Sequence, residues 1–258
     1  MTSAKKRKRR DGLGWLLILV AFLALGGLAA AATMLRPPPT DEATFCRTDV
    51  PLGAHTLILV DATDRLDARH KKRLDAVITQ ERARLAPYDR LSILALRPAT
   101  PQEPRILFSL CLPPDGRMAN PLFENPKLIQ QRWDERIGKA LESAERRAGG
   151  SGAARVSPIA ASIRAAAADP DFAAPGPTRR FVLVSDMLEN DPAGFSIYRN
   201  DDPAMMQTRN AALESVTVRV VMLDRPGDEA RQDLMRAKFW APYFAASGAA
   251  RVDWDPVG

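Results

Sequence analysis

The sequence predicts an α/β fold: a mostly parallel, doubly wound sheet of Rossmann type with one antiparallel strand, preceded by an N-terminal transmembrane helix. From about residue 54 onward, short apolar runs alternate with segments of helical periodicity, which is typical of a parallel sheet with helices on both faces. One link between successive strands is too short for a crossover helix, so that pair should be antiparallel. An uncharged run near the N-terminus predicts the membrane helix.

The N-terminal segment has the pattern of a membrane anchor. Residues 13–35 form an uncharged, mostly apolar run of 23 residues, which corresponds to roughly 34 Å of helix and can cross a bilayer core of about 30 Å. The basic run at 5–10 predicts that residues 1–12 are a cytoplasmic tail and that the rest lies outside the cytoplasm, in the periplasm if the cell is bacterial. The four alanines at 29–32 leave a cleaved signal peptide as the alternative.

A proline-rich linker, residues 36–45, should separate the anchor from a single domain at 46–258. The chain has 37 Lys and Arg against 31 Asp and Glu. Six of the basic residues lie in 5–10, and residues 1–10 contain no acid, so the remainder carries 31 of each sign. The basic balance of the whole chain therefore gives no reason to expect a nucleic-acid partner.

The two cysteines, Cys46 and Cys111, are expected to pair in an oxidising compartment. Such a disulfide would join the start of the domain to its third strand and stabilise it by roughly 4 kcal/mol on a chain-entropy model. The alternative is two buried thiols.

The first half of the domain begins with a fully buried strand at 55–60, followed by a helix at 66–85 that Pro87 ends. Its charged residues, Glu included, are expected to lie away from its apolar face. Strands at 90–96 and 105–111 follow, joined by the short proline-rich turn that predicts the antiparallel pair. A long helix is expected at 127–148, which glycines at 149–152 end.

In the second half, Ser157 as N-cap and Pro158 at the first helical position predict a helix that runs to residue 168. The expected order is then a buried strand at 180–185, an irregular polar segment, a short helix before Ser215, a strand at 216–223, a helix at 228–247 kinked at Pro242, and an edge strand at 249–254.

Polar side chains gather where these strands end. Asp61, Thr63 and Asp64 follow the first strand, Ser157 follows the glycine-rich loop, and Ser185 and Asp186 end the fourth strand. In doubly wound folds, ligands bind at the carboxyl ends of the strands. Carboxylate and hydroxyl oxygens are ligands that Mg²⁺ prefers, so these residues are candidates for a metal site.

This arrangement resembles the von Willebrand factor A domain family over about residues 54–254. That family has an antiparallel third strand, an Asp-x-Ser-x-Ser loop after the first strand, a Thr from a second loop and an Asp at the end of the fourth strand. The resemblance implies a metal-ion-dependent adhesion site for Mg²⁺, or for Mn²⁺ or Ca²⁺. Its ligands by position are Asp61, Thr63, Ser157 and Asp186.

One position departs from the family pattern, because Arg65 stands where the family has its second Ser. A guanidinium group cannot ligate a cation. Three interpretations stay open: a divalent site in which Asp64 offsets Arg65, a metal-free site in which Arg65 pairs with Asp61 or Asp186 and replaces the metal, and a loop in which Thr63 or Asp64 only caps the following helix.

The family resemblance implies a membrane-anchored protein-interaction module of the cell envelope, with an unidentified protein as partner. Phe195 and Tyr198, on the polar segment after Asp186, suit an interaction loop, unless they fold back onto the core. His55 and His70 lack ligand spacing, and His70 is expected on a solvated face of its helix, beside a run of basic residues. No enzyme activity is expected. The alternatives are a metal-dependent hydrolase on a similar sheet and a metal-free structural component of an envelope complex.

Overall fold

The computed structural model describes residues 14–28, 37–63, 66–121, 124–149, 154–199 and 210–255. The chain divides into two compact units, Met1–Pro39 and Thr40–Gly258.

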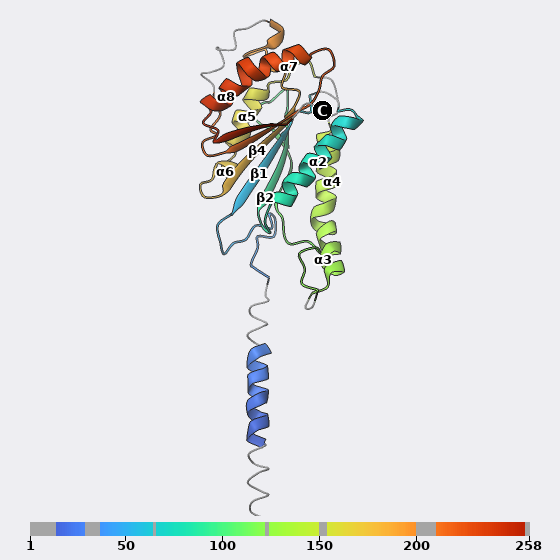
Figure 1. Cartoon of the computed structure of the whole chain (residues 1–258), viewed down its shortest axis with the longest axis vertical. Coiled ribbons are helices and arrows are strands. Elements are labelled where there is room, and N and C mark those ends of the chain that lie inside the picture. The colour runs from blue at the N-terminus through green and yellow to red at the C-terminus, as the bar shows by residue number, and fades with distance from the viewer. Residues whose placement is uncertain are drawn as a thin grey trace, which may run out of the picture. The chain divides into compact units, whose positions relative to one another are not determined.

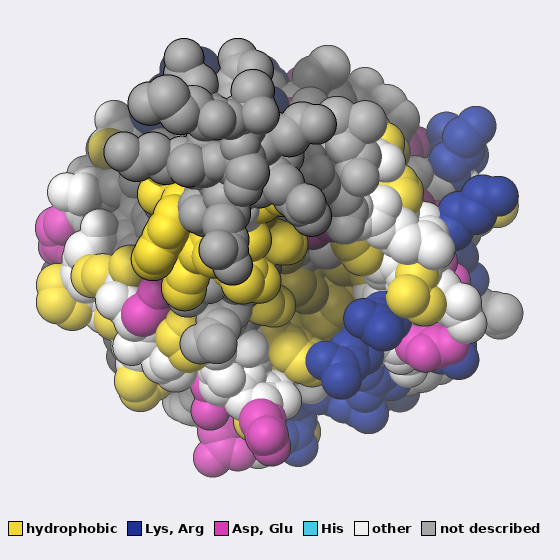
Figure 2. All heavy atoms as spheres, turned by 90° about the horizontal axis from the view of Figure 1, so that it is seen from below, with side chains coloured by type: hydrophobic (Ala, Val, Ile, Leu, Met, Phe, Trp, Pro, Cys, Tyr) yellow, Lys and Arg dark blue, Asp and Glu magenta, His cyan; other side chains and the backbone are white. Residues whose placement is uncertain are grey.

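The described part of the first unit is a helix over residues 14–28. Its apolar side chains are exposed, with Trp15 and Phe22 at 73% and 71%, and apolar side chains gather in the middle of the face drawn in Figure 2. Within the described residues, no helix is long and apolar enough to cross a membrane. Residue 13 and residues 29–35 of the predicted span lie outside the described residues.

The second unit is built on a six-stranded sheet with the strand order β3-β2-β1-β4-β5-β6 (Figure 1). β3 runs antiparallel to β2 and every other neighbouring pair is parallel, which confirms the predicted sheet. The strands are β1 (Ala54–Val60), β2 (Arg90–Ala95), β3 (Arg105–Cys111), β4 (Thr178–Ser185), β5 (Thr217–Met222) and β6 (Arg251–Asp255).

Helices cover both faces of this sheet. On one face they form a core with alternate residues of β1, β4 and β5, and on the other face the intervening residues pack against the second set of helices. Figure 1 shows the two layers, with α2 and α4 on one side and α5, α7 and α8 on the other. The helices are α2 (Ala68–Arg84), α3 (Pro126–Trp133), α4 (Lys139–Ala148), α5 (Ile159–Ala167), α6 (Pro170–Ala173), α7 (Glu229–Met235) and α8 (Ala241–Ala246).

Two of the three long helices that the sequence predicts, at 127–148 and 228–247, contain a π-helical turn. α3 and α4 are joined by η1 (Asp134–Gly138), and α7 and α8 by η4 (Arg236–Trp240). In the second case Pro242 lies in the first turn of α8 and lacks an N–H, so the widened turn falls just before the proline. The short helix expected before Ser215 is wrong for residues 210–215, where Glu214 instead forms an isolated bridge with Ala249.

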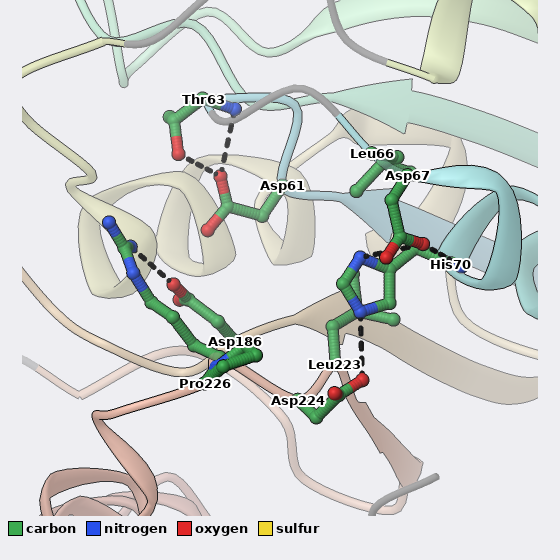
Figure 3. Close-up of a pocket in the computed structure, with 10 residues that line it drawn as sticks. Asp61, Thr63, Leu66, Asp67, His70, Asp186, Leu223, Asp224 and Pro226 are labelled. Carbon is green, nitrogen blue, oxygen red and sulfur yellow. Dashed lines mark hydrogen bonds and ion pairs between the residues drawn. The ribbon is translucent and has the colours of Figure 1, made fainter.

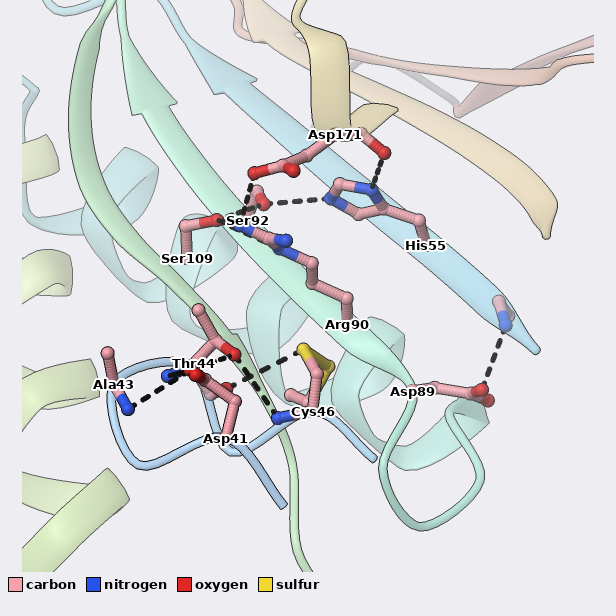
Figure 4. Close-up of a disulfide and its surroundings, with 12 residues drawn as sticks. Asp41, Ala43, Thr44, Cys46, His55, Asp89, Arg90, Ser92, Ser109 and Asp171 are labelled. Carbon is pink, nitrogen blue, oxygen red and sulfur yellow. Dashed lines mark hydrogen bonds and ion pairs between the residues drawn. A yellow bond between two sulfur atoms is a disulfide. The ribbon is translucent and has the colours of Figure 1, made fainter. Parts of the chain in front are cut away.

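The predicted disulfide is confirmed. Cys46 and Cys111 are bonded across 65 residues, with their Cα atoms 4.9 Å apart (Figure 4). The backbone N–H of Cys111 also donates to the carbonyl of Thr44 at 2.8 Å. The disulfide and this hydrogen bond fasten the start of the domain to β3, at the edge of the sheet.

A buried ionic network joins α2 to the sheet. The Glu81 carboxylate is 0% exposed and accepts from Arg180 at 2.7 Å and from Arg219 at 2.6 Å. Arg219 also donates to Asp255 at 2.7 Å. One carboxylate of α2 is thus paired with cations on β4 and β5, and through them with β6. This corrects the expectation that the Glu residues of this helix lie away from its buried face.

Candidate functional site

The candidate site forms where β1 and β4 end side by side. These strands are parallel neighbours, and the backbone N–H of Asp61, just after β1, donates to the carbonyl of Val184 in β4 at 2.8 Å. The next residue, Ser185, ends β4 and points its hydroxyl at the Asp61 carboxylate. Strand pairing alone therefore brings Asp61, just after β1, and Ser185, at the end of β4, together.

The Asp61 carboxylate is the centre of the cluster. Its Oδ1 accepts from the backbone N–H and the hydroxyl of Thr63, at 3.1 and 2.6 Å, and the two side chains face each other in Figure 3. Its Oδ2 accepts from the hydroxyls of Ser157 and Ser185, both at 2.9 Å. Three of the polar residues predicted to converge, Asp61, Thr63 and Ser157, are thus in direct contact, and Ser185 joins them.

Ser157 does not cap the helix that follows it, which corrects the expectation from its sequence. α5 begins at Ile159, and Ser157 directs its hydroxyl to Asp61 instead. The N-terminus of α5 is satisfied by Glu189, whose Oε2 accepts from the backbone N–H of Ala160 at 2.8 Å. A carboxyl group from the loop after β4 has taken the capping role, which frees the Ser157 hydroxyl for the cluster.

Thr63 is likewise not a helix cap, because its side chain is bonded to Asp61. α2 begins at Ala68 and is capped by Asp67, whose side chain accepts from the backbone N–H of His70. Asp64 and Arg65 lie between Thr63 and Asp67 in the chain and are outside the described residues. The pairing predicted for Arg65 therefore stays a prediction.

Asp186 has a cationic partner that the sequence did not suggest. Its Oδ2 accepts from the guanidinium group of Arg225 at 2.8 Å, and its Oδ1 from the backbone N–H of Leu188 at 2.9 Å. Burial, and secondarily the charge of Asp61, raise the pKa of Asp186 to about 6, against the opposing effect of Leu188 and Arg225. Two carboxyl groups thus share one small region, and Arg225 supplies a positive charge to it.

One signal in the sequence could have identified Arg225. It lies three positions after Met222, the last residue of β5, and β5 is the neighbour of β4. The residues that follow β5 must therefore emerge beside Asp186, at the same edge of the sheet.

A hollow of about 370 Å³ opens beside the cluster (Figure 3). Within it, His70 donates from Nε2 to Asp224 Oδ1 at 2.9 Å, and its side chain is only 14% exposed. His70 therefore faces the site, which corrects the expectation of a solvated helix face. The lining residues are Asp61, Thr63, Leu66, Asp67, His70, Asp186, Leu223, Asp224, Arg225 and Pro226.

A second hollow, of about 330 Å³, adjoins the first and shares Thr63 and Arg225 with it. Its outer wall includes Arg155, which is exposed, and Tyr198. The ends of β1, β4 and β5 therefore present a continuous uneven surface, in which Thr63 and Arg225 form the boundary between two depressions.

The two aromatic residues of the predicted interaction loop have different environments. Phe195 is 1% exposed and stacks on Phe239 of η4, with ring centroids 4.8 Å apart. Its expected place in the interaction loop is wrong, because burial against the core leaves no surface to present. Tyr198 is 46% exposed and lies under the guanidinium group of Arg231, 5.5 Å from the ring centroid.

The described residues do not fit a divalent cation. Both oxygens of Asp61 already accept hydrogen bonds from hydroxyl groups, and one oxygen of Asp186 is bonded to a guanidinium group that is always charged. Mg²⁺ needs near-octahedral oxygen ligation. Among the residues that the structure describes, no three His, Cys, Asp or Glu side chains are placed to hold a metal. The hydrolase interpretation gains no support from this site, since it requires such an ion.

His55 lies in a separate network, at the opposite end of β1 (Figure 4). Its Nε2 is 2.8 Å from the Ser92 hydroxyl, which is in turn 2.8 Å from that of Ser109. Burial, with a smaller contribution from the charge of Arg90, lowers the pKa of His55 to about 4. The imidazole is therefore neutral at physiological pH and serves to link β1, β2 and β3.

Comparison with known proteins finds likeness at the level of structure. Neither a protein-family model nor a curated protein matches the sequence. Among solved structures, the chain is similar to the VWA domain of SpRpn10, with 9% identity, a TM-score of 0.43, and coverage of 80% of this chain and 90% of that one.

Two further structures come from Bacteroides. The first is a conserved hypothetical protein, BatB, of Bacteroides thetaiotaomicron, with 11% identity, a TM-score of 0.39 and coverage of 80% and 92%. The second is an aerotolerance-related membrane protein of Bacteroides fragilis, with 12% identity, a TM-score of 0.36 and coverage of 79% and 92%. The fold described above rests on the strand order and directions of this chain, and not on these scores.

Proposed function

We propose that this chain is a membrane-anchored protein-interaction module of the cell envelope. In this proposal, residues 1–12 lie in the cytoplasm, residues 13–35 span the membrane, and residues 36–45 link the span to an extracytoplasmic domain at 46–258. The partner is a protein that docks on the surface formed by the two adjoining hollows, which we name the strand-end surface.

The observation that carries the binding role is the arrangement of this surface. The hydroxyls of Ser157 and Ser185 both donate to the Asp61 carboxylate, so the cluster fixes three loops relative to one another rather than presenting an activated nucleophile. The two hollows share a wall and are bordered by exposed Arg155 and Tyr198. An uneven, preorganised surface with an exposed aromatic and an exposed Arg has the features of a protein-binding site.

Three features support the anchor and the orientation. The uncharged run of 23 residues is long enough to span a bilayer, and basic residues precede it. A helix that exposes apolar side chains on all sides suits a lipid environment. The Cys46–Cys111 disulfide is typical of an oxidising compartment.

Site-specific photocrosslinking in intact cells tests the binding surface. A p-benzoylphenylalanine at position 198 is expected to form a defined adduct with a second protein on irradiation, because Tyr198 borders the strand-end surface. The matched control is the same residue at position 50: Val50 is 43% exposed and precedes β1, at the opposite end of that strand from Asp61. Adducts of equal yield and identity from both positions, or none from position 198, would contradict the proposal.

A further inference from the structure

We infer that the guanidinium group of Arg225 is a built-in cation that takes the place of a divalent metal at the Asp61–Asp186 site. This inference concerns the site itself, and it can fail or hold independently of which partner the strand-end surface binds.

The position of Arg225 is fixed by a buried side chain. Gln232 of α7 is 2% exposed, and its amide group donates to the carbonyl of Asp186 at 2.8 Å and to that of Leu223 at 2.7 Å. Its side-chain oxygen accepts from the backbone N–H of Arg225 at 3.2 Å. A single glutamine therefore ties the loop after β5 to the loop after β4, which holds Arg225 beside Asp186.

The side chain of Arg225 bridges two carboxylates. NH1 donates to Asp186 Oδ2 at 2.8 Å, and Nε lies 3.4 Å from Asp228 Oδ2 in the first turn region of α7. Both carboxylate side chains are only 16% exposed. The Arg225 side chain is 41% exposed, so the ion pair is shielded from water mainly on the side of the carboxylates, and the backbone of Arg225 is held by Gln232.

The charges explain why a cation is needed here. Asp61 is 6% exposed and all the groups that donate to it in the described structure are neutral. Asp186 lies close enough to Asp61 that the charge of Asp61 raises the pKa of Asp186. Two neighbouring carboxylates with little access to water repel each other, and a nearby positive charge offsets this repulsion. Arg225 provides that charge permanently, and for the same reason repels a divalent ion that approaches the pair.

The inference predicts that removing Arg225 exposes a latent metal site. The probe is Mn²⁺, titrated into the purified full chain in detergent and followed by the electron paramagnetic resonance signal of the free ion. Arg225→Gln, which keeps a polar side chain but removes the charge, should bind Mn²⁺ at least about tenfold more tightly than the parent, equivalent to ~1.4 kcal/mol. Arg225→Lys, which keeps the charge, should bind as weakly as the parent.

Three further variants make the test decisive. Adding Asp186→Asn to Arg225→Gln should abolish the gained binding, which locates the ion at this site. Arg236→Gln is the matched control, because it removes an exposed Arg of η4 whose carboxylate partner is Asp233 and neither Asp186 nor Asp228. Tight Mn²⁺ binding by the parent that Asp61→Asn abolishes would overturn the inference. So would a folded Arg225→Gln chain, verified by circular dichroism, with no gain in Mn²⁺ affinity.

Discussion

At the N-terminus of α5, the Glu189 carboxyl group is fully buried and only partly satisfied. Its Oε2 accepts from the backbone N–H of Ala160, whereas no described residue is hydrogen-bonded to its Oε1. Burial raises the pKa of Glu189 well above its ordinary value, and the charges of Asp191 and Asp61 act in the same direction. The group is therefore protonated in the folded chain at pH values where it is ionised in the unfolded chain.

Glu189→Gln should make stability less dependent on pH. Because the folded-state pKa is raised, the proton bound by Glu189 stabilises the fold fully below the unfolded pKa of about 4.3, and this contribution is lost as the pH rises through the folded pKa. The amide mimics the protonated acid at every pH. At pH 8 the variant should exceed the parent in free energy of unfolding, because the parent has lost the contribution of the bound proton and the amide has nothing to lose.

Denaturant melts between pH 4 and pH 8 check this expectation, with the two curves converging at the acid end. Glu42→Gln is the control, since Glu42 is exposed and should leave the pH dependence as in the parent. Parallel curves for the parent and Glu189→Gln across this range would contradict the assignment of a protonated group.

For single residues, the sequence predicted those members of the site whose position follows from the end of a strand. Asp61 follows a strand that is unmistakably buried, and its contacts with Thr63 and Ser157 follow from the loops that meet there. The place of Arg225 at this edge of the sheet follows from its position just after β5, but its ion pair with Asp186 was not predictable, because the direction of a long side chain depends on a local anchor. That anchor, Gln232, is itself defined only by tertiary packing.

Among the elements, α2 depends on a charge that it buries. Glu81 lies on the same helical face as Leu74, Val77 and Ile78, and accepts from Arg180 and Arg219 in the sheet. Replacing one member of a buried ionic group leaves the others without compensation, which usually costs about 3–5 kcal/mol. Glu81→Gln is therefore expected to lower the free energy of unfolding by ~3 kcal/mol.

Urea denaturation followed by tryptophan fluorescence measures this loss. The matched control is Glu103→Gln, because Glu103 is 77% exposed and 4.0 Å from Arg97, and a surface pair of this kind contributes about 0–1 kcal/mol. If the two variants lose the same stability, the Glu81 network does not hold α2 to the sheet.

The central strands β1 and β4 were well predicted because each contains a continuous apolar run that is buried on both faces, and such runs need no distant partner to be recognised. The helices were predicted less completely, for two physical reasons. A π-helical turn changes the hydrogen bonding over a few residues without changing the apolar stripe, as in η1 and η4. From the sequence alone, a charged residue such as Glu81 is expected to face solvent, because its partners Arg180 and Arg219 are 99 and 138 residues away in the chain.

For the whole molecule, the orientation across the membrane and the state of the cysteines should change together. The basic run at 5–10 is expected to hold the N-terminus in the cytoplasm, so that the domain with Cys46 and Cys111 meets an oxidising compartment. Replacing all six basic residues by Gln should place a substantial fraction of chains in the opposite orientation. In that fraction the two thiols should stay reduced, because the cytoplasm is reducing.

Two independent measurements on the same cells can establish this coupling. Protease added from outside should digest the domain in the parent chain and spare it in the inverted fraction. A maleimide reagent of high mass, applied after denaturation in acid, should label both cysteines of the inverted fraction and so increase its apparent mass. The oxidised parent should keep its mass. Replacing six exposed basic residues within the domain, Arg84, Lys127, Arg132, Arg136, Lys139 and Arg146, is the matched control and should alter neither result. Protection from protease without free thiols, or free thiols in a fully digested domain, would separate orientation from oxidation and contradict the proposed topology.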